Sequence, residues 1–355
     1  MSPPLDREAP LARGAPLARG ANLEAPAPPA RPLAALLARA STLWTLLILL
    51  ALIALFGIAS PDFFSRASWL ATSQFAVEYL LLGLGETFVI ITGGIDLSVG
   101  AILGFSGMLG ALAMSALIAR HAGTQVVLAA GIAASLASGS FVGWVNGQVI
   151  TRLRLTPFVV TLGMLSMCTG GIYLLNNGEN IDTIPDLVGT LGSYSIGGWI
   201  PLTVLVTALA CAGSALLLDQ TRFGLRTYAI GSNPVGAARA GIDVERHLVK
   251  IYTLAGFFSA LAGLMVMARF ASASVQAGAN DELDAITAVV IGGASLFGGR
   301  GTILGTVIGG FVITVMVTGL ILIGVQPFWQ QVAVGAILIF AVAVDQLRNR
   351  LIDSA

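Results

Sequence analysis

The chain has 355 residues, of which 56% are hydrophobic and only 10% are charged, and its mean hydropathy is +0.89. Soluble domains carry about 25% charged residues, so this composition excludes an ordinary soluble enzyme and predicts an all-α polytopic membrane protein in contact with lipid. The 18 basic and 18 acidic residues cancel to a formal net charge of zero, and nucleic acid is not expected as a partner.

The first 32 residues differ in composition from the rest of the chain. They are rich in Ala, Pro and Arg, and Ala-Pro-Leu-Ala-Arg-Gly occurs at 9–14 and again at 15–20. Such a stretch lacks the apolar content of a core, so 1–32 is predicted to be a disordered tail before a membrane domain at 33–355. It is a poor signal peptide, because the apolar run begins about 40 residues in. We expect the tail to stay attached and cytoplasmic.

The membrane domain is expected to contain about ten transmembrane helices. A helix of about 20 apolar residues crosses the hydrocarbon core, and the eighth apolar segment falls short of that length. The predicted spans lie near 42–59, 69–92, 98–118, 124–149, 157–176, 200–218, 249–269, 283–297, 301–323 and 328–346. Cys168 and Cys211 both lie in apolar runs and are interpreted as core residues, and no cofactor, metal site or catalytic residue is expected.

Basic residues are distributed unevenly between the two sides of the predicted membrane. Fifteen of the 18 Lys and Arg residues fall on one side, and only Arg66, Arg120 and Arg269 fall on the other. Because Lys and Arg are enriched in cytoplasmic loops, the bias predicts that both termini are cytoplasmic and that 177–199 faces the opposite side. Without the tail the bias is still ten to three.

A Gly-rich break, Gly-Gly-Ile-Asp-Leu-Ser-Val-Gly at 93–100, separates the second and third predicted spans. An ionisable group beside such a break is expensive in lipid and is tolerated where protein or a water-filled path surrounds it. Asp96 and Ser98 are therefore candidates for a translocation path. Alternatively, the segment is a short polar loop at the membrane surface in which Asp96 caps the next helix. The two interpretations are compatible.

The same pattern recurs later in the chain. Residues 89–100 align with 288–299, and Ile-Leu-Gly follows both, at 102–104 and 303–305. Paired Gly-interrupted segments in two halves point to a transporter binding site, so an internal repeat is predicted. Chance similarity between Gly-rich apolar stretches is the alternative. Whether the halves are parallel or inverted depends on the short eighth span.

The chain cannot bind ATP through a P-loop of its own. That motif needs Gly-x-x-x-x-Gly-Lys-Ser/Thr, and the single lysine, Lys250, lies in Leu-Val-Lys-Ile. If transport is active, its energy comes either from an ion gradient or from a separate ATPase.

The largest cytoplasmic connection, at 219–248, helps to decide between an ion gradient and a separate ATPase as the energy source. Ser232 or Asn233 followed by Pro234 is typical of a helix start, so a short helix over 234–240 is predicted to end at Gly241. Its alanines offer little apolar area to lipid, which favours docking on a partner protein over a helix that lies on the membrane. The residues expected at this contact are Gly231, Asn233, Pro234, Ala237, Ala238 and Gly241.

The break at 93–100 resembles the signature of permease subunits of bacterial ABC sugar importers of the ribose, xylose, arabinose and galactofuranose group. The resemblance continues in the same order to the C-terminus and leaves the tail unexplained. The further matching segments are Asn146-Gly147, 156–163, 221–241 and 292–302.

The resemblance implies a multi-pass subunit of the bacterial inner membrane that forms the path for a monosaccharide, either a pentose or a hexose. It also implies two permease copies, identical or paralogous, a cytoplasmic ABC ATPase that hydrolyses the ATP, and a periplasmic sugar-binding protein. The short helix near 234–241 would be the coupling helix that meets the ATPase.

The alternative is an ion-coupled secondary transporter. Glu78, Glu86 or Asp96 would then be the proton or sodium site, and Glu78 and Glu86, about two turns apart on one helix face, could line a path together. Alternatively, the two glutamates are polar groups of the bundle interior that neighbouring helices satisfy by hydrogen bonds. A passive channel is disfavoured, because no polar-striped helix suits a wide pore. The candidate residues for the translocation path are Glu86, Asp96, Ser98, Asn146 and Asn176.

Overall fold

The computed structural model describes residues 32–353. The tail predicted over 1–32 lies, apart from Pro32, outside the described residues. Contacts divide the chain into residues 1–39 and 40–355, and the second unit holds everything described below except the first residues of α1.

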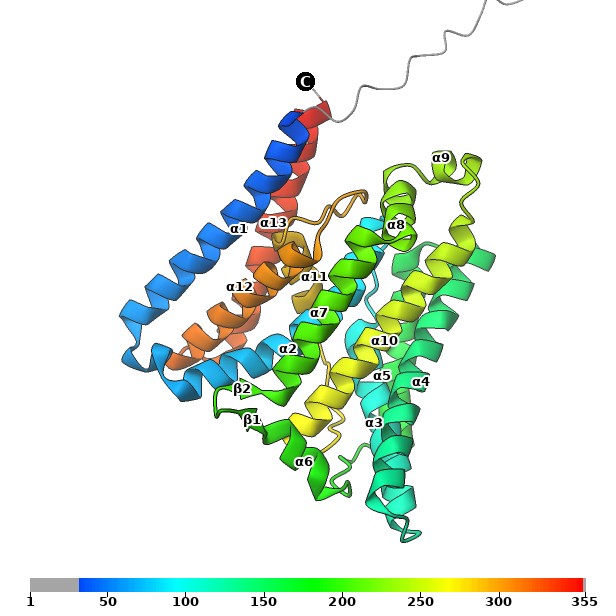
Figure 1. Cartoon of the computed structure of the whole chain (residues 1–355), viewed down its shortest axis with the longest axis vertical. Coiled ribbons are helices and arrows are strands. Elements are labelled where there is room, and N and C mark those ends of the chain that lie inside the picture. Colours follow the sequence, from blue (N-terminus) through cyan, green and yellow to red (C-terminus); the bar gives the residue numbers. More distant parts are fainter. Residues whose placement is uncertain (1–31, 354–355) are drawn as a thin grey trace, which may run out of the picture. The chain divides into compact units, whose positions relative to one another are not determined.

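The second unit is built almost entirely of helices (Figure 1). Its elements are α1 (Pro32–Ala59), the 3-10 helix η1 (Pro61–Phe64), α2 (Arg66–Ile91), α3 (Val99–Ile118), α4 (Thr124–Arg152), α5 (Pro157–Leu175), α6 (Asp186–Ser193), β1 (Ser195–Ile196), β2 (Ile200–Pro201), α7 (Leu202–Gln220), α8 (Arg222–Ser232), α9 (Pro234–Arg239), α10 (Val244–Phe270), α11 (Asp281–Ile291), α12 (Ile303–Leu322) and α13 (Pro327–Asp353).

Helices form at each of the ten predicted spans, but the count of ten crossings is not confirmed. Within the described residues, seven helices are long and apolar enough to cross a membrane, namely α2, α3, α4, α5, α7, α10 and α12. The eighth predicted span is wrong in extent: α11 has only 11 residues, because the chain turns at Gly292 and at Gly293, whose φ is +95°.

Glycines at four-residue spacing on α4 let this helix pack closely against α10. Gly139, Gly143 and Gly147 face Gly256, Tyr252 and Val249 in that order, so the two helices run antiparallel. A Cβ at Gly143 would lie 2.1 Å from the carbonyl oxygen of Tyr252. Only glycine allows this close approach of the two backbones.

The two Gly-interrupted segments follow helices that run in the same direction. Gly292 packs on Gly305 and Ala288 packs on Gly309, so α11 is antiparallel to α12. The contacts of α2 with α12 are also antiparallel, because Leu80 meets Gly310 while Thr87 bonds to Thr306. Hence α2 and α11 are parallel to each other, and the related segments have the same orientation.

Candidate functional site

Four of the five path candidates lie together at the break between α2 and α3. Glu86 comes from the last turns of α2, Asp96 and Ser98 come from the break, and Asn146 comes from α4. Each of them is fully buried, with a relative accessibility of 0%. The site therefore lies inside the helix bundle.

The backbone of the break is shaped by its glycines. The hydroxyl of Thr92 donates back to the carbonyl oxygen of Val89 (2.7 Å) where α2 ends, and Gly93 then adopts a left-handed conformation with φ +79°. A Cβ on Gly94 would lie 2.5 Å from the Tyr252 hydroxyl of α10. The Gly-Gly pair thus lets the chain leave α2 and pass against α10.

Hydrogen bonds hold Asp96 within the break. Its Oδ1 accepts from the backbone N–H of Ser98 (2.9 Å) and from the Ser98 hydroxyl (2.5 Å), and Asn146 Nδ2 donates to that hydroxyl oxygen (2.9 Å). Thr161 of α5 accepts from the backbone N–H of Leu97 (3.1 Å). Ser98, not Asp96, precedes α3, so Asp96 is not the residue that caps this helix.

Several buried polar oxygens of this site have no hydrogen-bond partner among the described residues. They are Oδ2 of Asp96, Oδ1 of Asn146 and the hydroxyl of Tyr252, which can donate as well as accept. The Glu86 carboxyl group lies beside the backbone N–H of Asp96. Tyr252 is 1% exposed and was missed at the sequence level, because a single tyrosine in an apolar span has no distinguishing pattern. Thr161 lies in the segment 156–163, which shares the resemblance to sugar-importer permeases, but no sequence pattern pointed to its side chain as part of the site.

Glu78 belongs to a different group of side chains. It lies near Asp281 at the start of α11 and near Arg269 at the end of α10. The Arg269 guanidinium also lies over the ring of Phe75, 4.2 Å from its centroid. Eight residues of helix, about 12 Å, separate Glu78 from Glu86. Glu78 is therefore not part of the buried site, whereas Glu86 and Asp96 lie near each other in it.

Asn176 also lies outside the site. It follows the last residue of α5, where its Nδ2 donates to the carbonyl oxygen of Glu179 (3.0 Å). Along α5, 15 residues separate it from Thr161, which corresponds to about 22 Å.

The predicted short helix exists; it begins at the predicted residue and ends at Arg239, one residue before the predicted end. The side chain of Asn233 accepts from the backbone N–H of Gly236 (2.8 Å), Pro234 is the first helical residue, and Gly241 follows with φ +83°. Asn233, Pro234, Ala238 and Gly241 are exposed, whereas Ala237 is buried. The exposed residues of α9 lie at the far end of α7 and α10 from α6 and the β-hairpin (Figure 1).

The base of this loop contacts both Gly-rich breaks. A Cβ at Gly231 of α8 would lie 1.7 Å from the carbonyl oxygen of Ile91, which accepts from the backbone N–H of Gly299 (2.8 Å). The Tyr228 hydroxyl donates to the carbonyl oxygen of Gly301 (2.7 Å). Burial raises the pKa of Tyr228 to about 12, so the hydroxyl stays a donor at neutral pH. Gly231 is thus a contact between α8 and the breaks and not part of the exposed face of α9.

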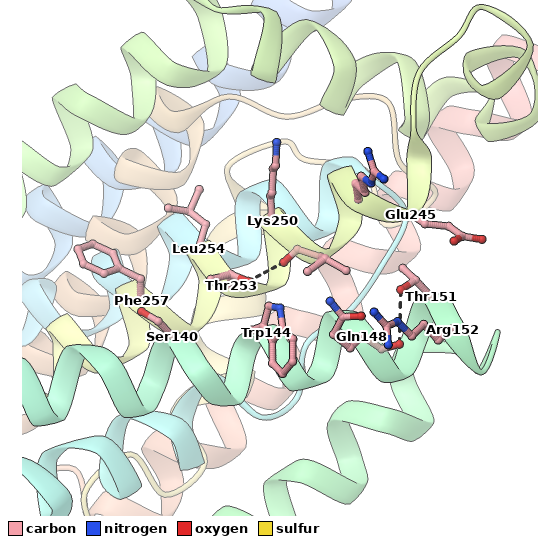
Figure 2. Close-up of a pocket in the computed structure, with 12 residues that line it drawn as sticks. Ser140, Trp144, Gln148, Thr151, Arg152, Glu245, Lys250, Thr253, Leu254 and Phe257 are labelled. Carbon is pink, nitrogen blue, oxygen red and sulfur yellow. Dashed lines mark hydrogen bonds between the residues drawn. The ribbon is translucent and has the colours of Figure 1, made fainter.

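A groove with a volume of about 740 Å³ opens between α4 and α10. Figure 2 shows Trp144 and Gln148 of α4 opposite Thr253 and Lys250 of α10. An indole face with an amide and a hydroxyl nearby can bind a hydroxylated ring by stacking and hydrogen bonds. Asn146 and Tyr252 lie on the same two helices but are buried, so the groove and the buried site are separate.

The described residues contain no group of three or more His, Cys, Asp and Glu side chains that could hold a metal ion. Cys168 is buried, as expected for a core residue, whereas Cys211 is only partly buried.

Comparisons with known proteins agree on one family. A family model described as "Branched-chain amino acid transport system / permease component" matches residues 69–342. The ribose import permease protein RbsC of Escherichia coli K12 is 34% identical over 293 residues, which cover 82% of this chain and 89% of the relative. RbsC of Bacillus subtilis is 42% identical over 274 residues (76% and 81%), and the fructose import permease protein FrcC of Rhizobium meliloti is 36% identical over 291 residues (80% and 79%). No solved structure matches the chain.

Proposed function

This chain belongs to the permease-component family that these relatives share, and we propose that it is the membrane-spanning subunit of an ATP-driven ABC importer for a monosaccharide. The relatives are named as import permeases for ribose, fructose, galactose and allose, which supports a pentose or hexose as the substrate. ATP is hydrolysed by a separate chain.

The observation that carries this proposal is the contact between the loop with α9 and the two breaks. The exposed residues of α9 provide the docking surface for the ATPase, and α8 connects it to the carbonyl oxygen of Ile91 and to Gly299 through Gly231. A displacement of α9 therefore reaches the segments before α3 and α12. This is how ATP hydrolysis outside the membrane changes helix positions within it.

The ion-coupled alternative has no support from the relatives, which are import permease components.

We further propose that two permease copies, identical or paralogous, assemble with the ATPase and a periplasmic sugar-binding protein. Both termini and α9 face the cytoplasm. The positions of the arginines support this orientation: Arg152 and Arg239 lie at the end where α4 and α9 finish. Arg66 instead donates to the carbonyl oxygen of Gly198, in the β-hairpin at the opposite end (2.7 Å).

Single cysteines test the orientation. A membrane-impermeant thiol reagent applied outside should label Thr190→Cys and miss Ala238→Cys. The reverse pattern would overturn the orientation.

The buried candidate residues contribute to transport by fixing the conformation of the break between α2 and α3. Because Glu86, Asp96, Ser98 and Asn146 are fully buried, a sugar does not touch them in this arrangement. The groove beside Trp144 supplies the accessible contacts, and the buried site fixes the segment that moves.

Uptake into proteoliposomes tests the proposed function. They would contain this chain with its ATPase and sugar-binding protein partners, and uptake of labelled ribose, fructose and allose would be measured. We expect uptake of at least one sugar to require ATP inside and the binding protein outside, and to be unaffected by ionophores. Uptake that ionophores abolish and that continues without ATP would refute the proposal.

A further inference from the structure

One face of α8 contacts the membrane-spanning helices at the base of the loop that carries α9. Phe223, Thr227 and Gly231 are spaced four residues apart, so they lie on the same face of this helix. Gly231 meets the break after α2, whereas Phe223 and Thr227 meet side chains of α2 and α10. This face therefore joins the loop to more than the breaks alone.

The Thr227 hydroxyl joins α8 to α10. Its Oγ1 lies 2.9 Å from the carbonyl oxygen of Phe223 and 2.9 Å from Nε2 of His247. A hydroxyl has one proton and a carbonyl oxygen can only accept, so both contacts are hydrogen bonds only when His247 donates from Nε2. Thr227 is fully buried and His247 is 5% exposed. The bond between α8 and α10 is thus excluded from water and has a defined direction.

The ring of Phe223 extends this contact to α2. Its centroid lies 4.6 Å from that of the His247 ring and 5.9 Å from that of the Phe88 ring. Both separations are those of packed aromatic pairs. Phe88 is fully buried in the last turns of α2, two residues after Glu86. One set of side chains therefore fixes α8 to both α10 and α2.

The helix α10 is packed too closely on α4 to move without it. Their backbones are in contact and leave no room for a Cβ at Gly143 or at Gly256. Coupling between distant sites is carried by such packed and hydrogen-bonded elements. A displacement of α8 that reaches α10 therefore carries α4 as well, and with the two helices the groove beside Trp144.

We propose that His247 and Thr227 are positioning residues of the transport cycle, which link the loop that docks the ATPase to the pair formed by α10 and α4. This assignment rests on the proposed function. Both residues are buried and act through α8, without contact to the sugar or to ATP. When their hydrogen bond is lost, the ATPase still docks on α9 and hydrolyses ATP, but α10 and α4 no longer follow α8. Hydrolysis is then uncoupled from uptake.

The test measures sugar uptake and ATP hydrolysis together in proteoliposomes that contain the complete complex. Thr227→Val and His247→Leu each remove one partner of the hydrogen bond. We expect each to lower the sugar taken up per ATP hydrolysed by about fivefold or more, the effect of one hydrogen bond, with unchanged co-purification of the ATPase. Thr227→Ser and His247→Gln should restore the wild-type ratio, because they keep a hydroxyl and an N–H donor.

A double variant and a matched control separate this bond from a general loss of structure. Thr227→Val combined with His247→Leu should be no worse than either change alone, because both remove the same bond. Thr207→Val is the control and should leave the ratio unchanged. Thr207 is also a buried threonine, and its hydroxyl donates to the carbonyl oxygen of Thr203 within α7 (2.9 Å).

The wild-type reaction distinguishes a failure of this assignment from a failure of the proposed function. Wild-type uptake that needs no ATP would overturn both. ATP-dependent wild-type uptake with an unchanged ratio in Thr227→Val and His247→Leu would overturn this assignment alone, and so would an equal loss in Thr207→Val. Thr227→Val nearly preserves side-chain volume, so it keeps the test decisive if His247→Leu fails to insert.

Discussion

Gly231→Ala tests the link between the coupling helix and the membrane-embedded breaks. The added Cβ would lie 1.7 Å from the carbonyl oxygen of Ile91 and 2.6 Å from the backbone nitrogen of Gly299. Real Cβ atoms essentially never approach closer than 3.0 Å, so α8 and the break must separate by more than about 1 Å. Both neighbours are backbone atoms, and no rotamer change can relieve the clash.

These contacts give the loss in free energy of unfolding that Gly231→Ala should cause. Overpacking of this kind costs about 1–3 kcal/mol, and loss of the hydrogen bond from Gly299 to Ile91 adds about 1 kcal/mol. For a chain of 355 residues, with an unfolding entropy of about 2.1 cal/mol/K per residue, this total of about 2–4 kcal/mol corresponds to a fall in Tm of roughly 3–5 °C. Because the exposed residues of α9 are untouched, the ATPase should still co-purify, whereas uptake should fall by about tenfold or more.

The assays are thermal unfolding of the purified complex, co-purification of the ATPase, and sugar uptake. Gly213→Ala is the matched control, because a Cβ there meets nothing within 4 Å on α7. If Gly231→Ala matched this control in both Tm and uptake, the proposed contact between α8 and the breaks would be refuted.

Three further substitutions probe separate parts of the protein. Asp96→Asn should lower uptake while the protein remains folded and inserted, because it removes a buried carboxyl group but keeps an oxygen that can accept from Ser98. Wild-type uptake would show that Asp96 contributes to transport only through this hydrogen bond. Ala238→Trp should leave insertion normal but abolish ATPase association and uptake, because it adds a large side chain to the exposed face of α9; wild-type co-purification and uptake would remove the coupling assignment. Trp144→Ala should lower uptake without changing ATPase association, because it removes the indole face of the groove; unchanged uptake would exclude the groove from the sugar path.

Much of the helix layout could be predicted from the sequence, because apolar length alone sets the position of a span. The short helix α9 was also predictable, since Asn233, Pro234 and Gly241 act through local backbone geometry. The extent of α11 was not. Its apolar run continues past Gly292, and only the packing of that glycine on Gly305 shows where the chain turns.

The buried site was predictable only in part. Asp96 and Ser98 were identified because a carboxylate in a Gly-rich break is locally unusual. Tyr252 and Thr161 meet the break from α10 and α5, and such contacts between distant segments have no local signature. Asn176 lies at the other end of α5 from the buried site, and its place in the translocation path stays a prediction.

The most direct test of the central claim is whether sugar on one side of the membrane controls ATP hydrolysis on the other. The measurement is the ATPase activity of proteoliposomes that contain this chain and its ATPase partner, with and without sugar-loaded binding protein outside. We predict that the loaded binding protein stimulates hydrolysis severalfold and that Ala238→Trp abolishes the stimulation. An ATPase rate that is independent of the loaded binding protein, together with sugar uptake that needs no ATP, would contradict this account.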